Sequence, residues 1–392
     1  MWFELGVVYL AALSIADFSL FNYIGFDPSV SYVEFSAISG LWSLSFITTS
    51  EVLGRLADRG QHRSLALLSS AGIVVSAIVF LVSRGSVMLL GLAYVIHAFA
   101  TASANLAFST GVFELTSSDS WEFRTSVQRL SLYLLRGLAL LLVSMAVPLI
   151  GSSGPVMASL FAASALGVAF FSFLIPSFPL LERRLNRVLN GLSPLGSYSA
   201  SLAALVGGRY GVIYEISTTS RYRRSSPLPM AISASLAAFV GDYFLTALPL
   251  YLRSDNVSFA SYSFSFGVAS LVGALALVVF DAFPADGWLV GSLVAARGLW
   301  MSLGLVFASD YGGLTLYLVP SVTLFASIDL LLYRFFMRRS SGYGVHIYAA
   351  LRELGSLAGS LTGGLAIMGG RAVFLGLPIS ASLASAGLLT AA

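Results

Sequence analysis

Residues Gly54–Arg63, with the sequence GRLADRGQHR, form a short charged connector between two long apolar stretches. The stretch before it ends in WSLSFITTSEVL (42–53), and the stretch after it begins with SLALLSSAGIVVSAIVFLV (64–82). Lipid offers no hydrogen-bond partner to an irregular charged segment, so this connector must turn at a membrane surface and return the chain. The connector therefore predicts a protein that crosses a membrane more than once.

The composition agrees with this interpretation. Hydrophobic residues make up 57% of the 392 residues and charged residues only 10%, with a mean hydropathy of +0.88, whereas a soluble domain carries about 25% charged residues. The absence of cysteine excludes disulfides, a thiolate nucleophile and cysteine metal sites. All 21 basic residues are Arg, and without Lys no phosphate-binding P-loop can form, which excludes an ATP-driven motor within this chain.

Spanning the hydrocarbon core takes about 20 apolar residues per helix. On this criterion the sequence predicts an all-α membrane protein of twelve spans, arranged as six and six. The bundles are expected at 1–177 and 230–392, with a cytoplasmic linker at 178–229 that begins with an interfacial helix. The predicted helices are 4–25, 33–53, 64–83, 87–108, 127–149, 155–177, 230–252, 259–280, 287–308, 313–335, 343–368 and 371–391.

The distribution of Arg predicts the orientation, because positive charges accumulate in cytoplasmic loops. With both termini inside, the outer loops hold only Arg84, Arg253 and Arg371. A multi-pass protein of the plasma membrane with cytoplasmic N- and C-termini is therefore expected. The inner segments hold Arg55, Arg59, Arg63, Arg124, Arg129, Arg183, Arg184, Arg187, Arg209, Arg221, Arg223, Arg224, Arg338 and Arg339.

A weak internal repeat relates the two predicted bundles. LAALSIADFSL (10–20) in the first helix is similar to SLAAFVGDYFL (235–245) in the seventh, and each places an Asp followed by an aromatic residue near the helix centre. Parallel repeats of six helices, with a binding site at their interface, are one way in which transporters are built.

With these features the chain resembles the major facilitator superfamily, whose signature after the second helix is roughly G-x-L-A-D-R-x-G-R-[RK]. Gly54, Leu56, Ala57, Asp58 and Arg59 match in register, and Arg63 matches the closing basic position. Residues 60–62 depart from the signature, and the equivalent connector of the second half, DAFPADGW (281–288), keeps only acidic residues.

The resemblance implies that Asp58 holds the two halves together in one access state, so we assign the connector to gating. The alternative is a basic loop that only sets the topology. Salt bridges at the cytoplasmic helix ends are further gating candidates, and they would tune the balance between states because surface pairs are individually weak. The candidates for these bridges are Glu51, Glu114, Arg129, Arg334, Arg352 and Glu353.

Charged side chains inside the predicted spans need a reason, because each costs roughly 2.5–3.5 kcal/mol at a helix centre. The carboxylates are Asp17, Asp242 and Asp329, in the first, seventh and tenth helices, which line the central cavity of the resembling family together with the fourth. The functional interpretation is binding of a proton or solute, and the alternative is a static Asp–Arg pair that holds helices together.

Four other polar side chains lie within the predicted spans. His97 and Asn105 fall in the fourth helix, where His97 could titrate near neutral pH or only pack, and Asn105 could bind solute or bond across helices. Arg136 and Arg297 are the cationic counterparts of the carboxylates, and Arg297 could be either a cavity residue or a structural partner for Asp329.

These features predict a secondary active transporter of a small solute, coupled to protons and working as a monomer among membrane lipids. Neutralising Asp17 or Asp242 is expected to abolish the coupling. A passive facilitator of the same fold and a polytopic enzyme acting on lipids are the alternatives. An enzyme would show clusters of His or carboxylates in loops near the headgroups, so enzymatic activity is not expected, and neither is a cofactor, a metal or a nucleic-acid partner.

Overall fold

A computed structural model gives the fold of the chain. Within the described residues it consists of long α-helices and one short 3-10 helix, without a β-strand. Eight of these helices are long and apolar enough to cross a membrane. The predicted class, an all-α multi-pass membrane protein, is confirmed. The structure describes residues 2–58, 61–115, 121–150, 156, 160–164, 167, 227–254, 257–309, 311–340 and 345–391.

The first half of the chain forms five long helices in the described ranges. The predicted sixth helix, 155–177, and the predicted linker, 178–229, fall largely outside the described residues, although residues 160–164 are helical. The helices of this half are α1 (Trp2–Gly25), α2 (Tyr32–Asp58), α3 (His62–Ser83), α4 (Val87–Leu115) and α5 (Trp121–Ile150).

The second half forms six long helices. Each agrees with a predicted span to within a few residues, except that the predicted ninth helix ends early and continues as a 3-10 helix, Gly304–Ser309. The helices are α10 (Pro227–Ser254), α11 (Phe259–Asp281), α12 (Gly287–Leu303), α13 (Tyr311–Ser340), α14 (Val345–Met368) and α15 (Arg371–Ala391).

Side-chain caps fix where several helices begin. Ser31 accepts a hydrogen bond from the Glu34 backbone N–H, while the Glu34 carboxylate accepts one from the Ser31 N–H, which is a capping box at the start of α2. The Asp286 carboxylate accepts from the Leu289 N–H at 2.7 Å and caps α12 in the same way. These polar caps lie between apolar runs, so the local sequence sets where these spans begin.

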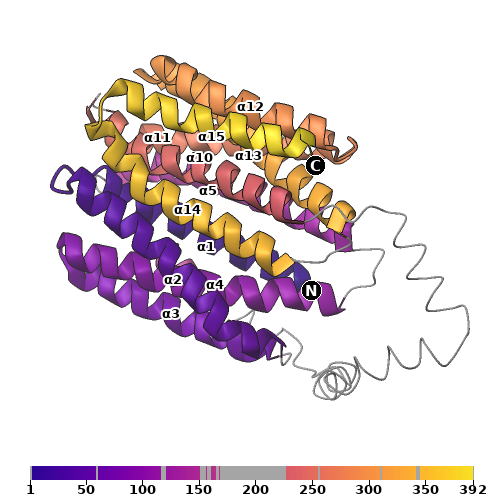
Figure 1. The fold of residues 1–392 in the computed structure, drawn as a ribbon. Coiled ribbons are helices and arrows are strands. Elements are labelled where there is room, and N and C mark those ends of the chain that lie inside the picture. Colours follow the sequence, from indigo (N-terminus) through magenta and orange to yellow (C-terminus); the bar gives the residue numbers. More distant parts are fainter. Residues whose placement is uncertain are drawn as a thin grey trace, which may run out of the picture.

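The helices form an elongated bundle with both chain termini at one end, which we call the terminal end; the other is the far end (Figure 1). Two pairs of helices join the halves: α2 packs against α14, and α5 packs against α11. At the α5–α11 crossing, a Cβ added to Gly137 would lie 2.9 Å from the Gly267 carbonyl oxygen, so glycine permits the close approach.

Within the second half, α14 lies directly on α10. Gly355, Gly359 and Gly363 are spaced four residues apart, and a Cβ on any of them would overlap a backbone carbonyl of α10. These three glycines therefore act in helix packing. They hold α10, the helix that carries Asp242, tightly in place.

The connector quoted above is mostly helical, which corrects the predicted boundaries. Gly54–Asp58 form the last turn of α2, and α3 begins at His62. A Cβ on Gly54 would meet nothing within 4 Å in the described chain, so no close helix contact seen there requires a glycine at this position. Arg59 and the Asp58 side chain lie outside the described part of the chain.

Candidate functional site

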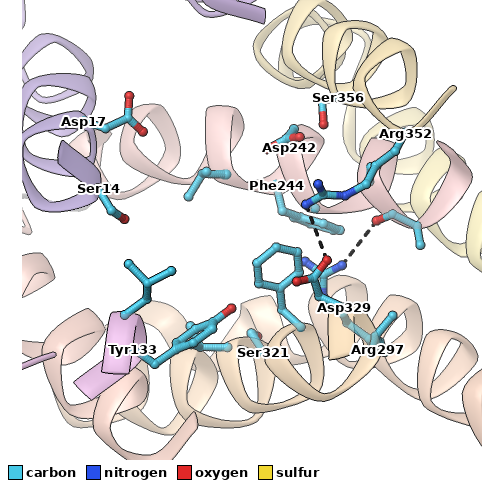
Figure 2. A pocket seen from close by; sticks show the side chains of 18 of the residues that line it. Ser14, Asp17, Tyr133, Asp242, Phe244, Arg297, Ser321, Asp329, Arg352 and Ser356 are labelled. Carbon is cyan, nitrogen blue, oxygen red and sulfur yellow. Dashed lines mark hydrogen bonds and ion pairs between the residues drawn. The ribbon is translucent and has the colours of Figure 1, made fainter. Parts of the chain in front are cut away.

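A cavity of about 420 Å³ lies between the two halves of the bundle. Small-molecule sites commonly measure roughly 300–1,000 Å³. Its walls come from α1, α2, α4 and α5 on one side and from α10 to α14 on the other (Figure 2). They include the predicted set of first, fourth, seventh and tenth helices. The ionisable Asp, Glu and Arg side chains on its walls are Asp17, Arg136, Asp242, Arg297, Asp329, Arg352 and Glu353.

Asp242 lies on α10 next to a glycine. Figure 2 shows its carboxyl beside Ser356 of α14, and it forms no ion pair within the described residues. A Cβ on the preceding Gly241 would lie 3.0 Å from Nη2 of Arg297, so the glycine gives the guanidinium room against the α10 backbone. Asp242 thus faces the cavity without a cationic partner.

Asp17 holds the matching position on α1 but has a histidine behind it. His97 Nδ1 lies 3.5 Å from Asp17 Oδ1 and 3.3 Å from the Thr101 hydroxyl. The His97 side chain is fully buried and is not on the cavity wall, whereas Asp17 is 28% exposed. His97 thus lies behind Asp17, on the protein side of that carboxylate, and its part in binding a proton stays a prediction.

Arg136 of α5 lies between aromatic rings from both halves. Its guanidinium carbon is 5.0 Å from the Phe18 ring centre on α1 and 4.7 Å from the Phe266 ring centre on α11. Cation–π attraction holds the charge there. Arg136 forms no ion pair with Asp17 or with any other carboxylate of the described chain.

Arg297 of α12 reaches the cavity, although its helix lies at the edge of the bundle (Figure 1). Its Nη1 donates to the Ala237 carbonyl at 3.3 Å, and its guanidinium carbon lies 4.8 Å from the Phe325 ring centre. The ion pair with Asp329, one of the two roles considered for Arg297, is absent from the described contacts. The α10 backbone and an aromatic face hold this arginine instead.

Asp329 of α13 is neutralised by two other arginines. Its Oδ2 lies 2.6 Å from Arg129 of α5, and its Oδ1 lies 3.5 Å from Arg352 of α14. Arg352 also lies 3.5 Å from Glu353. This cluster joins the halves on the terminal-end side of the cavity, so Asp329 is ion-paired here, whereas Asp17 and Asp242 have no arginine partner in the described chain. The predicted role of Asp329 in binding a proton or solute stays a prediction.

A second polar contact joins the halves at the terminal end. Asp281, the last residue of α11, pairs with Arg334 of α13 and accepts a hydrogen bond from Ser126 of α5 at 3.0 Å. Arg334 also donates to Ser126 at 2.8 Å. Asp281 is the first residue of DAFPADGW (281–288), the equivalent connector of the second half, whose charged residues are all acidic.

The far end is joined mainly by aromatic packing. The ring of Phe26, after α1, lies 5.5 Å from that of Tyr262 on α11, and Phe18 stacks on the same tyrosine at 5.7 Å. Arg253, at the end of α10, donates to the carbonyls of Asp27 and Val30 at 2.5 and 3.0 Å. The two ends therefore use different contacts: ion pairs at the terminal end, and aromatic rings with an arginine on backbone carbonyls at the far end.

The remaining predicted site residues are dispersed. Asn105 lies on the cavity wall, and Arg63 lies exposed in the first turn of α3. The side chain of Glu114 lies outside the described residues. Within the described ranges no three His, Asp or Glu side chains come together as a possible metal site. Sequence reasoning missed the cage of Phe18 and Phe266 around Arg136, because aromatic residues are common on every span.

The comparison with solved structures defines the fold. The xylose transporter XylE from E. coli, in its inward-open conformation, matches with a TM-score of 0.61 over 98% of this chain and 95% of that chain, at 15% sequence identity. The chain therefore shares the overall fold of this transporter, in agreement with the all-α multi-pass fold that the sequence resemblance implied. No protein-family model and no curated protein matches the sequence.

Proposed function

We propose that this chain is a secondary active transporter, which moves a small solute across the plasma membrane by alternating access and couples that movement to protons. The observation that carries the proposal is Asp242: a carboxyl on the wall of the central cavity, within a membrane-spanning helix, without a cationic partner in the described chain. A charge in that position is costly and typically functional.

Alternating access needs contacts that form and break between the halves. The terminal end has the ion cluster of Asp329 and the contacts of Ser126 with Asp281 and Arg334, and the far end has the Phe26–Tyr262 packing. With the Arg distribution placing both termini in the cytoplasm, the charged contacts would close the cytoplasmic side and the aromatic contacts the outer side. The solved neighbour, a transporter caught inward-open, supports a fold that opens at one end.

Proton coupling follows from the exposure of Asp242 to the cavity. A carboxyl without a fixed cationic partner can take up a proton from water on one side and release it on the other as the halves rock. A ligand or proton shifts such an equilibrium only through different affinities for the two states. Burial of Asp242 against α14 in one state and its exposure in the other would provide that difference.

The test is uptake into liposomes that contain the purified chain, with an imposed pH gradient. Radiolabelled lactate, succinate, inorganic phosphate, alanine and xylose are offered one at a time, and a pH dye inside the vesicles records proton movement. We expect uptake of at least one solute with proton entry in wild type, and loss of proton entry in Asp242→Asn. The matched control is Glu4→Gln, which changes an exposed carboxylate in the first turn of α1.

Uptake that ignores the pH gradient in wild type and variants alike would contradict coupling and would favour the passive facilitator. The elution and melting profiles of the purified chain show whether it is folded. A folded chain that moves none of these solutes would contradict transport of solutes of this size range.

A further inference from the structure

Arg136 is a cation in the centre of the molecule that forms an ion pair with no carboxylate of the described chain. Resting on the proposed transport function, we propose that the solute carries an acidic group, a carboxylate or a phosphate, and that Arg136 binds this group directly. Neither the fold nor the similar transporter identifies this class of solute for the chain.

Two aromatic rings hold Arg136 in place. Phe18 and Phe266 lie against the guanidinium at 5.0 and 4.7 Å, one from each half of the bundle. Aromatic contacts fix a planar cation while leaving its N–H edge available, and this edge matches the two oxygens of an acidic group. Arg136 is on the cavity wall, so the acid can reach that edge.

A hydrogen-bond donor of Arg136 also lacks a partner in the described chain. The Arg136 Nε is buried without a hydrogen-bond partner, and no hydrogen bond from this guanidinium to another described residue is present. A buried donor without a partner costs roughly 1–3 kcal/mol, and more for a charged group. An acidic solute would satisfy it, because an arginine and a carboxylate or phosphate commonly form two parallel hydrogen bonds.

The balance of charges on the cavity wall also favours an acidic solute. Arg136 and Arg297 are the two cavity arginines without an ion pair in the described chain, and Asp17 and Asp242 are the two cavity carboxylates without an arginine partner. With both carboxyls ionised the four charges cancel. With both protonated, two positive charges remain, and an anionic group is attracted. Binding of protons and binding of acid therefore favour each other, and this coupling is reciprocal by linkage.

A sugar or another neutral solute would leave these positive charges unneutralised once the carboxyls took up protons. A cationic solute would add to them. The arrangement thus favours uptake of an acid together with protons over the other solute classes, and it gives the coupling proposed for Asp242 a physical purpose.

The experiment is a thermal-shift titration of the purified full-length chain in nanodiscs at a pH below neutral. The probes are lactate, succinate and inorganic phosphate, with lactamide, glycerol and xylose as neutral counterparts. We expect at least one acid to raise the melting temperature in a saturable way, with no effect from its neutral counterpart. The carboxylate and phosphate arms distinguish the two sources of acidic group.

Variants assign the effect to Arg136. R136Q should weaken the binding midpoint by at least about thirtyfold, since loss of one partner of a desolvated charge pair typically costs 2 kcal/mol or more. R136K keeps the charge but loses the planar fork, so an intermediate midpoint is expected. R84Q, an arginine in the loop between α3 and α4, is the matched control and should bind like wild type.

Equal acid binding by R136Q and wild type would overturn the proposal, as would saturable binding of only neutral or cationic probes, or no stabilisation by any acid. The failure of the transport proposal looks different. Acid binding that depends on Arg136 without uptake into liposomes would leave this inference standing and contradict transport. Proton-coupled uptake of xylose that R136Q does not alter would contradict this inference and leave the transport proposal standing.

Discussion

Asp17 and Asp242 hold matching positions in the two halves of the molecule, yet their neighbours differ. Asp17 has His97 3.5 Å behind it, whereas Asp242 lies beside the Ser356 hydroxyl with no titratable ion-pair partner in the described chain. The internal repeat thus preserves the carboxyl but not its surroundings. We infer that the second half carries the main proton site and that Asp17 and His97 form a supporting pair.

The largest effect is expected from neutralising the two carboxylates separately. Asp242→Asn should remove solute accumulation driven by a pH gradient. Asp17→Asn should slow it by roughly ten- to hundredfold, the size expected from losing one charge-assisted contact. Initial rates of uptake into liposomes measure both effects. Equal loss in the two variants would show that the halves act alike and would remove the distinction between them.

The next effect tests whether α10 must be held in place for Asp242 to act. Gly359→Ala puts a methyl group into the α10 backbone, so we expect a loss of about 1–3 kcal/mol in stability, as for other overpacked sites, together with slower uptake. The control is Gly376→Ala in α15, where a Cβ would meet nothing within 4 Å. Melting temperatures that rank the two variants equally would contradict the tight α10–α14 contact.

A third prediction concerns Asp329, the carboxylate of the second half that is already paired. Asp329→Asn should keep the proton-to-solute ratio but favour states that are open at the terminal end, by about 1–3 kcal/mol. This is less than for a fully buried pair, because Arg129 and Asp329 are 19% and 24% exposed. The chain has no cysteine, so spin labels on two introduced cysteines in α5 and α13 report the distance cleanly. An unchanged distance distribution would contradict the gating role.

The smallest effect is the energetic coupling between Asp17 and His97. A double-mutant cycle with Asp17→Asn and His97→Gln should give an interaction energy of about 0.5–3 kcal/mol, while Asp242→Asn and His97→Gln should be additive within about 0.5 kcal/mol. Rates of exchange of labelled for unlabelled solute, at saturating solute, provide the four measurements of each cycle. Additivity in both cycles would separate His97 from Asp17.

The fold was predictable because span length, polar connectors and Arg placement are local properties of the sequence. The charges of the cavity were predictable in position for the same reason: each interrupts an apolar run. Their partners were not. Arg297 was a candidate partner for Asp329, but the rotation of α13 and the crossing of α5 bring Arg129 to it instead. Pairing across the two halves depends on helix packing, which no single segment encodes.

Glycines illustrate the same limit from another side. Gly54 begins the charged connector, yet a Cβ there would meet nothing within 4 Å in the described chain. Gly241 belongs to no sequence motif, yet it gives Arg297 its place beside α10. A glycine is informative only once the helix facing it is known.

The central claim is that Asp242 couples protons to solute, and accumulation measured alongside exchange tests it most directly. Liposomes with wild-type chain should concentrate the transported solute when the pH gradient points inward. Liposomes with Asp242→Asn should still exchange labelled for unlabelled solute across the membrane but should not concentrate it. Accumulation by the variant at the wild-type level would contradict the claim.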